Sequence, residues 1–264
     1  MKQICIFLAA AIFIVVTQLG CTKDSTLLKN QGNAAQNLGE AYMAHGNYPL
    51  AFKEFLKAEK LMPKNPYVQN NLGLIYMVQD KWNMAILHFN RAIKINPNYS
   101  DAKNNLGAVY LIKKDWNRAI GIFNEVENDA LYTTPHNALF NLGVAYYNKK
   151  SYKISKRYFH KVLDHYERGF AKDITYIKTL KGLGNNYLAL GRIIEAKEIL
   201  ERAVELAPEY APLYLDLAKV YQCLDENTKA IKSIEKVIKL APASIIRQKA
   251  ELIAEQIKTK EQTR

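Results

Sequence analysis

The histidines of the chain do not form a pattern typical of a catalytic or metal site. They are His45, His88, His136, His160 and His165. No two of them have the four-residue spacing that places a ligand pair on one helix face. The sequence also contains neither a glycine-rich phosphate loop nor a nucleophile elbow. We therefore expect a protein that is not an enzyme and that needs no metal or cofactor.

Asparagine is the polar residue that recurs at a fixed position, directly before a leucine. The row, with two doubled positions, is Asn37, Asn70, Asn71, Asn104, Asn105 and Asn141. At the two later equivalent positions the chain has Gly182 and Asp216. An amide carries donors and an acceptor, so a row of them can pair with the backbone of an extended peptide. The alternative is that asparagine is simply tolerated there.

Apolar residues lie beside these asparagines at helical spacing. They are Leu74, Met77, Leu111, Phe140, Val144 and Tyr147. Two interpretations stay open. The residues are contacts between neighbouring helices, or they form the floor of a groove that takes an amphipathic helix or a strand from a partner protein.

Positive charge gathers in one part of the chain. The net charge is +12, and residues 149–184 hold ten basic and three acidic side chains. The patch that we single out is Lys149, Lys150, Lys153, Lys156, Arg157 and Lys161. It is either a solvated face or a site for an acidic protein or an anionic lipid phosphate.

A repeat positions all of these residues. Leu-Gly pairs recur at steps of 34, 34, 36 and 41 residues, beginning at Leu38 and ending at Leu183, and Leu217-Ala218 follows 34 residues later. A tyrosine comes four residues after each leucine, a small residue thirteen after it, and a large apolar residue seventeen after it. Residues four apart share one helix face. The pattern predicts helical hairpins that bury a core by stacking on one another.

This pattern resembles the tetratricopeptide repeat, a helix-turn-helix unit of the same period. We expect six copies, at 32–65, 66–99, 100–133, 136–169, 177–210 and 211–244. The resemblance implies an all-α fold, a right-handed solenoid of six repeats with a C-terminal capping helix over 245–264. The insertion of residues 170–176 is expected to change the pitch of the superhelix or to lengthen the flanking helices.

The first twenty residues have the features of a signal peptide. One positive charge precedes an apolar run over 4–16, which is shorter than the roughly 20 residues of a membrane span. Gly20-Cys21 behind this run resembles a bacterial lipoprotein signal. The resemblance implies removal of 1–20 and lipidation of Cys21, and we expect a polar tether over 21–31. An uncleaved anchor and an ordinary secretory signal are the alternatives. All three predict export, which argues against nucleic acid as a partner.

An exported, lipid-anchored chain of six such repeats resembles the pilot lipoproteins of type IV pilus systems. Asp129-Ala130-Leu131-Tyr132, ahead of the fourth repeat, adds to the resemblance. It implies a location at the outer membrane facing the periplasm, and a role in assembling the secretin, the ring through which the pilus passes. The partner would be a secretin subunit or a peptide segment, and no small-molecule substrate is expected.

Two alternatives to this function remain. One is a scaffold for another envelope or secretion system, because a fold does not fix a function. The other is an enzyme subunit or a lipoprotein that binds a small molecule, for which the sequence offers no closed pocket and no catalytic group.

Overall fold

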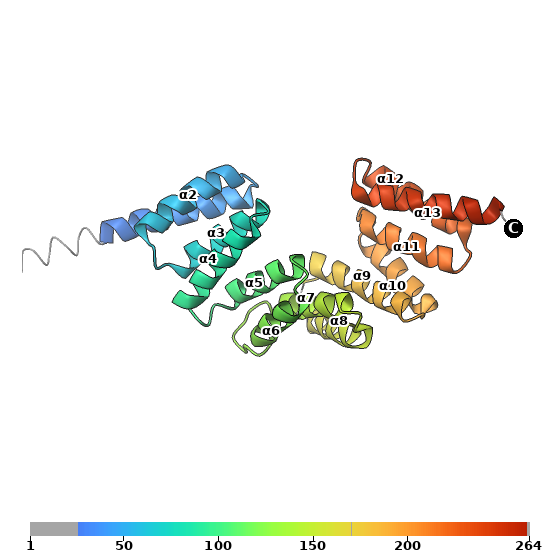
Figure 1. Cartoon of the computed structure of the whole chain (residues 1–264), viewed down its shortest axis with the longest axis horizontal. Coiled ribbons are helices and arrows are strands. Elements are labelled where there is room, and N and C mark those ends of the chain that lie inside the picture. The colour runs from blue at the N-terminus through green and yellow to red at the C-terminus, as the bar shows by residue number, and fades with distance from the viewer. Residues whose placement is uncertain (1–25, 170, 263–264) are drawn as a thin grey trace, which may run out of the picture. The chain divides into compact units, whose positions relative to one another are not determined.

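The computed structural model describes residues 26–169 and 171–262, and all regular structure in these ranges is helical (Figure 1). The predicted all-α class is confirmed. The expected signal peptide and Cys21 lie outside the described residues. No helix within the described ranges is long and apolar enough to cross a membrane.

The chain divides into two compact units, Met1–Lys113 (unit 1) and Lys114–Arg264 (unit 2). The division falls in the turn of the third predicted repeat, between its two helices, and not at a boundary between repeats.

Unit 1 is a stack of helical hairpins. A helix over 26–44 is followed by α2 (Tyr48–Leu61), α3 (Pro66–Val78), α4 (Trp82–Ile95) and α5 (Ser100–Ile112). The helix α3 contacts α2 and α5 in addition to its own hairpin partner α4. Each hairpin therefore shares its apolar face with the next, as a repeat that cannot form a core alone must do.

Residues 26–31, the second half of the predicted tether over 21–31, are helical. The helix over 26–44 already includes residues 26–31, whose side chains are all exposed. Gly32 lies against Met62, since a Cβ atom on this glycine would be 2.6 Å from Met62 Cγ. This contact anchors the helix, and the leucines at 27 and 28 favour its continuation towards the N-terminus.

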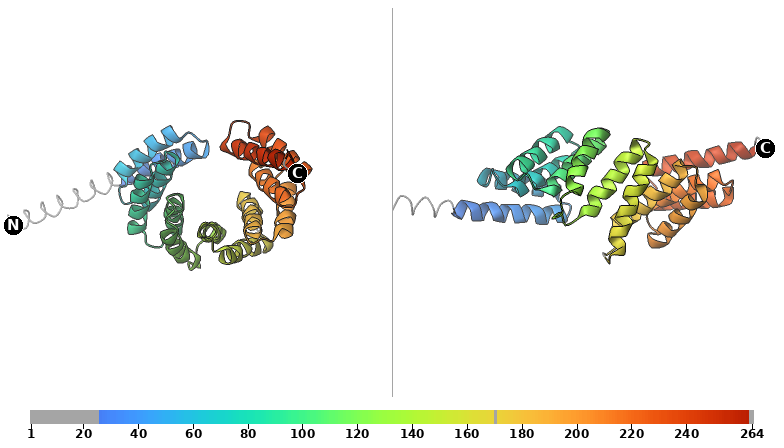
Figure 2. Two further views of the ribbon diagram at one scale, coloured as in Figure 1. Left: turned by 45° about the vertical axis from the view of Figure 1, so that its right-hand side comes forward. Right: turned by 90° about the horizontal axis from the view of Figure 1, so that it is seen from below.

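Unit 2 continues the pattern over a longer stretch. Its helices are α6 (Trp116–Glu127), α7 (Pro135–Asn148), α8 (Tyr152–Glu167), α9 (Ile174–Ala189), α10 (Ile193–Leu206), α11 (Ala211–Cys223), α12 (Asn227–Leu240) and α13 (Ile245–Gln262). The hairpins α7–α8, α9–α10 and α11–α12 follow one another from green to red in Figure 2. Among the first helices, α9 contacts both α7 and α11. The first helices thus form one side of unit 2.

The repeated small and large apolar positions form the core, as predicted. Ala85 and Phe89 of the second repeat are both 0% exposed. A Cβ atom on Gly73 would lie 2.5 Å from Cε1 of Phe89. The same close approach joins Gly39 to Phe55, Gly143 to Phe159 and Gly184 to Leu200. Glycine at this position therefore lets a large side chain of the second helix pack directly on the backbone of the first.

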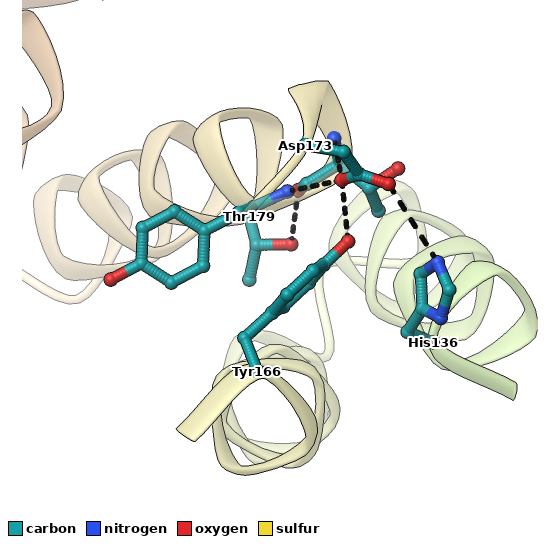
Figure 3. A network of polar contacts seen from close by, with 6 residues as sticks. His136, Tyr166, Asp173 and Thr179 are labelled. Atoms are coloured by element: carbon teal, nitrogen blue, oxygen red, sulfur yellow. Dashed lines mark hydrogen bonds and ion pairs between the residues drawn. The ribbon is translucent and has the colours of Figure 1, made fainter. Parts of the chain in front are cut away.

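The insertion around residue 170 lengthens the helices on both sides of it, one of the two expected effects. The helices α8 and α9 have 16 residues each, against 14 in α10 and α12. Asp173 caps α9, because its Oδ1 accepts hydrogen bonds from the backbone N–H groups of Thr175 at 2.7 Å and Tyr176 at 3.3 Å. The hydroxyl of Tyr166 on α8 donates to the same oxygen at 2.5 Å (Figure 3).

Two histidines add to the contacts between α7, α8 and Asp173. The ring of His136, at the start of α7, stacks on the ring of His165 with centroids 4.8 Å apart. Its Nε2 lies 3.9 Å from Oδ2 of Asp173 (Figure 3). Burial lowers the pKa of His136, and the Asp173 carboxylate opposes that shift. Burial also lowers the pKa of His165, and His136 and Arg168 add to the effect.

The C-terminal helix covers the last hairpin, as the capping prediction requires. The helix α13 contacts both α11 and α12. Ala250, Ile253 and Ile257 are at most 7% exposed, and Ile246 packs against the same core.

Candidate functional site

A pocket in unit 2 is the best candidate for a binding site. Its volume is about 270 Å³. It is lined by Phe140, Val144, Tyr147, Asn148, Phe159, Lys178, Lys181, Gly182, Asn185 and Tyr210. Three residues predicted for a groove floor, on α7, are thus brought together in one cavity.

The helical period explains how two helices build the walls. Phe140, Val144 and Tyr147 are spaced four and three residues apart, so they share one face of α7. Lys178, Lys181, Gly182 and Asn185 have the same kind of spacing and share one face of α9. The two helices are in contact, and Tyr210, directly before α11, adds to the lining. The pocket therefore lies among first helices of successive repeats.

Gly182 shapes the floor of the pocket. It occupies the position that holds asparagine in the earlier repeats. A Cβ atom there would lie 2.6 Å from Cζ of Phe159, whose side chain is 1% exposed. Phe140 packs against the same ring, with centroids 5.8 Å apart. The missing side chain thus lets a core phenylalanine reach the pocket.

A buried carboxylate holds the polar wall of the pocket. Asp216, on α11, is 2% exposed. Its Oδ2 lies 3.0 Å from Nζ of Lys181 and accepts a hydrogen bond of 3.0 Å from Asn185, while Lys219 donates to Oδ1 at 2.8 Å. Burial by itself raises the pKa of Asp216, but Lys181 and Lys219 outweigh it and hold the pKa below its usual value.

The charges of the two pocket lysines are therefore not equivalent. Lys181 is ion-paired with Asp216, a carboxylate that it shares with Lys219. Lys178 is exposed and has no carboxylate partner within the described part of the chain. The pocket thus offers an apolar floor with one lysine at its edge, Lys178, that is not held in an ion pair with the described residues.

The asparagine row of unit 1 is largely used for contacts between repeats. Asn70 and Asn71 are 5% and 7% exposed. The amide of Asn71 donates to Oε1 of Glu40 at 2.9 Å, and the amide of Asn105 donates to Oδ1 of Asn70 at 3.0 Å. Asn70 and Asn71 are buried because Asn71 donates to the preceding repeat and Asn70 accepts from Asn105 of the following one. Asn37 is exposed.

The other predicted groove residues fall in separate places. Asn104, Asn105, Leu74, Met77 and Leu111 are half-buried in unit 1, and Asn141 is half-buried in unit 2. Peptide binding by the complete row stays a prediction.

The predicted basic patch lies on α8 and the turn before it. Lys150, Lys153 and Arg157 are exposed. Lys149 donates to Oδ1 of Asn117 and Lys161 to Oε1 of Glu127, both at 2.6 Å and both on the neighbouring helix α6. Lys156 lies 5.6 Å from the ring centre of Tyr187. Part of the charge therefore joins adjacent repeats.

Several pocket residues were not predicted as site residues. Lys178 and Lys181 were counted only in the regional charge, and Phe159 only as core. The one available signal was the change from asparagine to Gly182 and Asp216 at the row position. No group of three or more histidine, cysteine, aspartate or glutamate side chains suited to a metal ion occurs within 26–169 and 171–262.

Family profiles described as tetratricopeptide repeats match several stretches of the chain. The matched segments include residues 66–99, 135–209 and 187–251. The chain is built of tetratricopeptide repeats. The predicted repeat type is confirmed by these profiles and by the helix pairs described above. A search of the curated proteins gives no match.

Solved structures of tetratricopeptide-repeat proteins share this fold at low sequence identity. PilF of Pseudomonas aeruginosa has a TM-score of 0.69 and 18% identity, over 85% of this chain and 98% of that one. PilW, described as a type IV pilus biogenesis factor, has a TM-score of 0.71 and 20% identity, over 82% and 96%. YrrB, described as having an unusual peptide-binding site, has a TM-score of 0.52 and 16% identity, over 75% and 97%.

Proposed function

We propose that this tetratricopeptide-repeat protein is a non-catalytic, lipid-anchored scaffold for the assembly of a type IV pilus secretin. In this role Cys21 holds the chain on the outer membrane, facing the periplasm. The repeats bind a segment of a secretin subunit. The pocket of unit 2 is the point of contact, and its apolar floor between successive first helices is the observation that carries the proposal.

The pocket supports protein binding over catalysis. Its lining supplies aromatic and aliphatic surface, two amides and two lysines. A general acid-base pair would need two groups that reach the same reacting atoms, and Asp216 is already occupied by its ion pairs. Peptides dock by placing apolar side chains in hydrophobic grooves or pockets, and this floor is suited to such a contact.

The pilus assignment draws on the resemblance of the N-terminal segment and the six repeats to pilot lipoproteins, and the fold shared with PilF and PilW is compatible with it. At 18–20% identity the similarity shows the fold alone, so the partner has to be established by experiment. A scaffold for a different secretion system remains the second candidate.

The anchor and the partner can be tested in the native envelope. The full-length chain is purified from membranes after mild crosslinking, and the co-purified proteins are identified. We expect a secretin subunit with the wild-type chain and its loss with Val144→Lys, which puts a charge on the pocket floor. Lys236→Glu, on an exposed position of α12 outside the pocket and the basic patch, is the matched control and keeps the partner.

The same preparation tests the anchor. Cys21→Ala should abolish metabolic lipid labelling and release the chain from the membrane, or leave an unprocessed precursor. Lipid label that stays on the Cys21→Ala protein contradicts the anchor. A secretin that co-purifies equally with Val144→Lys contradicts the pocket, and a different envelope complex in its place supports the second candidate.

A further inference from the structure

We infer that the unit 2 pocket is specific for a bulky aromatic side chain that is flanked by acidic residues in a peptide segment of the partner. The inference rests on the proposed function, because it names the chemistry that the same pocket recognises. It is argued from the size of the cavity, its floor and the unequal charges of its two lysines.

The size of the cavity suits one large side chain. Its volume of about 270 Å³ is at the small end of the roughly 300–1,000 Å³ of ligand sites. A single large side chain of a peptide needs less space than a whole small molecule, because the peptide backbone stays outside the cavity.

The floor favours an aromatic ring. Phe140 and Phe159 already pair in a tilted arrangement with an interplanar angle of 48°. Tyr147 and Tyr210 also line the pocket, and Tyr147 makes a tilted contact with Tyr152. Aromatic rings prefer edge-to-face or offset contacts with one another, so a guest ring gains more here than a flexible aliphatic chain of equal area.

The charge at the edge favours carboxylates beside that ring. Lys181 is already ion-paired with Asp216 at 3.0 Å, so an incoming carboxylate would compete with that pair and gain less from Lys181 than from Lys178. Lys178 is exposed, one helical turn earlier on α9, and has no carboxylate partner within the described residues. A basic flank on the peptide would meet Lys178 and would be repelled.

Three short peptides of one length separate these contributions. They are dye-labelled, amidated pentapeptides with the cores Asp-Trp-Asp, Asp-Ala-Asp and Lys-Trp-Lys. Binding to the full-length chain in lipid nanodiscs is followed by fluorescence anisotropy. We expect Asp-Trp-Asp to bind at least about tenfold more tightly than Asp-Ala-Asp, because the buried ring is lost. We expect it to bind roughly threefold more tightly than Lys-Trp-Lys, as for an exposed charge contact.

A charge reversal then assigns the preference to one residue. Lys178→Glu should invert the order of Asp-Trp-Asp and Lys-Trp-Lys, whereas Lys236→Glu on α12, outside the pocket and the basic patch, should leave it unchanged. Both positions are exposed, so thermal unfolding followed by circular dichroism should match the wild type for both variants.

The inference is overturned if the tryptophan and alanine peptides bind alike, or if the two charge reversals have equal effects. These outcomes differ from a failure of the proposed function. If the secretin still co-purifies and is lost with Val144→Lys, the scaffold role stands and only the stated side-chain chemistry is wrong.

Discussion

Gly182 lies so close to Phe159 that a Cβ atom on the glycine would be 2.6 Å from Cζ of the ring. One residue faces the pocket and the other is part of the core, so this contact links binding to folding. Elsewhere in the chain the same kind of contact joins a glycine to the second helix of its own hairpin, as for Gly73 and Phe89. Here it joins α9 to α8, the helix of the preceding repeat.

Gly182→Ala should therefore destabilise the protein. The added methyl group has to displace a buried ring, which costs about 1–3 kcal/mol in a packed core. Gly121→Ala on α6 is the matched control, because a Cβ atom there meets no atom within 4 Å, and alanine in a helix is favoured by up to about 1 kcal/mol. Urea unfolding should move the two variants in opposite directions. Equal stabilities would mean that Phe159 can move away without cost.

Asp216→Asn should lower stability and at the same time change the pocket. The substitution leaves Lys181 and Lys219 without their carboxylate. Breaking a fully buried pair costs about 3–5 kcal/mol. Because both lysines are partly exposed, at 28% and 42% of their side chains, we expect about 1–3 kcal/mol here.

The freed charge of Lys181 should also tighten binding of the Asp-Trp-Asp peptide. Asp164→Asn, on an exposed position of α8, controls for the loss of one negative charge. A variant that keeps full stability and unchanged affinity would show that Asp216 does not hold this wall.

Stability should fall as the pH decreases from 7.5 to 5.5. Burial lowers the folded-state pKa of His88, His136, His160 and His165. The unfolded chain, with a histidine pKa of about 6.5, then binds more protons than the folded chain as the pH falls through this range. The stabilisation is thus complete above about pH 6.5 and is lost below it.

The contribution of His136 can be isolated by comparing melting temperatures at the two pH values. His136→Gln should show a smaller drop than the wild type, and His45→Gln, at an exposed position of unit 1, should show the same drop as the wild type. A melting temperature of the wild type that does not change over this interval would contradict the assignment.

Asn71→Ala tests whether the asparagine row is structural. Its amide donates to Glu40 of the preceding repeat at 2.9 Å. Loss of such a bond should lower the free energy of unfolding by about 0.5–1.5 kcal/mol. Asn37→Ala, at an exposed position, should be close to neutral. If the two variants were equally stable and Asn71→Ala lost partner binding, the result would support peptide binding by the asparagine row instead of a structural role.

The sequence predicts the helix pairs well because their cause is local and repeated. Spacing alone places Ala85 and Phe89 on one face, and the structure buries both. The same logic finds Phe140, Val144 and Tyr147, which share one face of α7 and line one pocket.

The remaining pocket residues depend on contacts that spacing does not encode. Nothing in the sequence distinguishes Lys178 from Lys181. Only the position of Asp216 in the next repeat places Lys181, and not Lys178, in an ion pair. The burial of Asn71 likewise depends on Glu40 of the preceding repeat. Residues 26–31 are helical although they lie ahead of the repeat pattern, where the repeat spacing gives no signal.

Site-specific photocrosslinking in living cells tests the central claim most directly. A photoreactive amino acid is placed at Asn148, at an exposed position of the pocket lining, and in a second strain at Leu252, which is 56% exposed on α13. The account predicts a crosslink to a secretin subunit from position 148, none from position 252, and loss of the former with Val144→Lys. A secretin crosslink from position 252 alone, or one from position 148 that survives Val144→Lys at full yield, would contradict it.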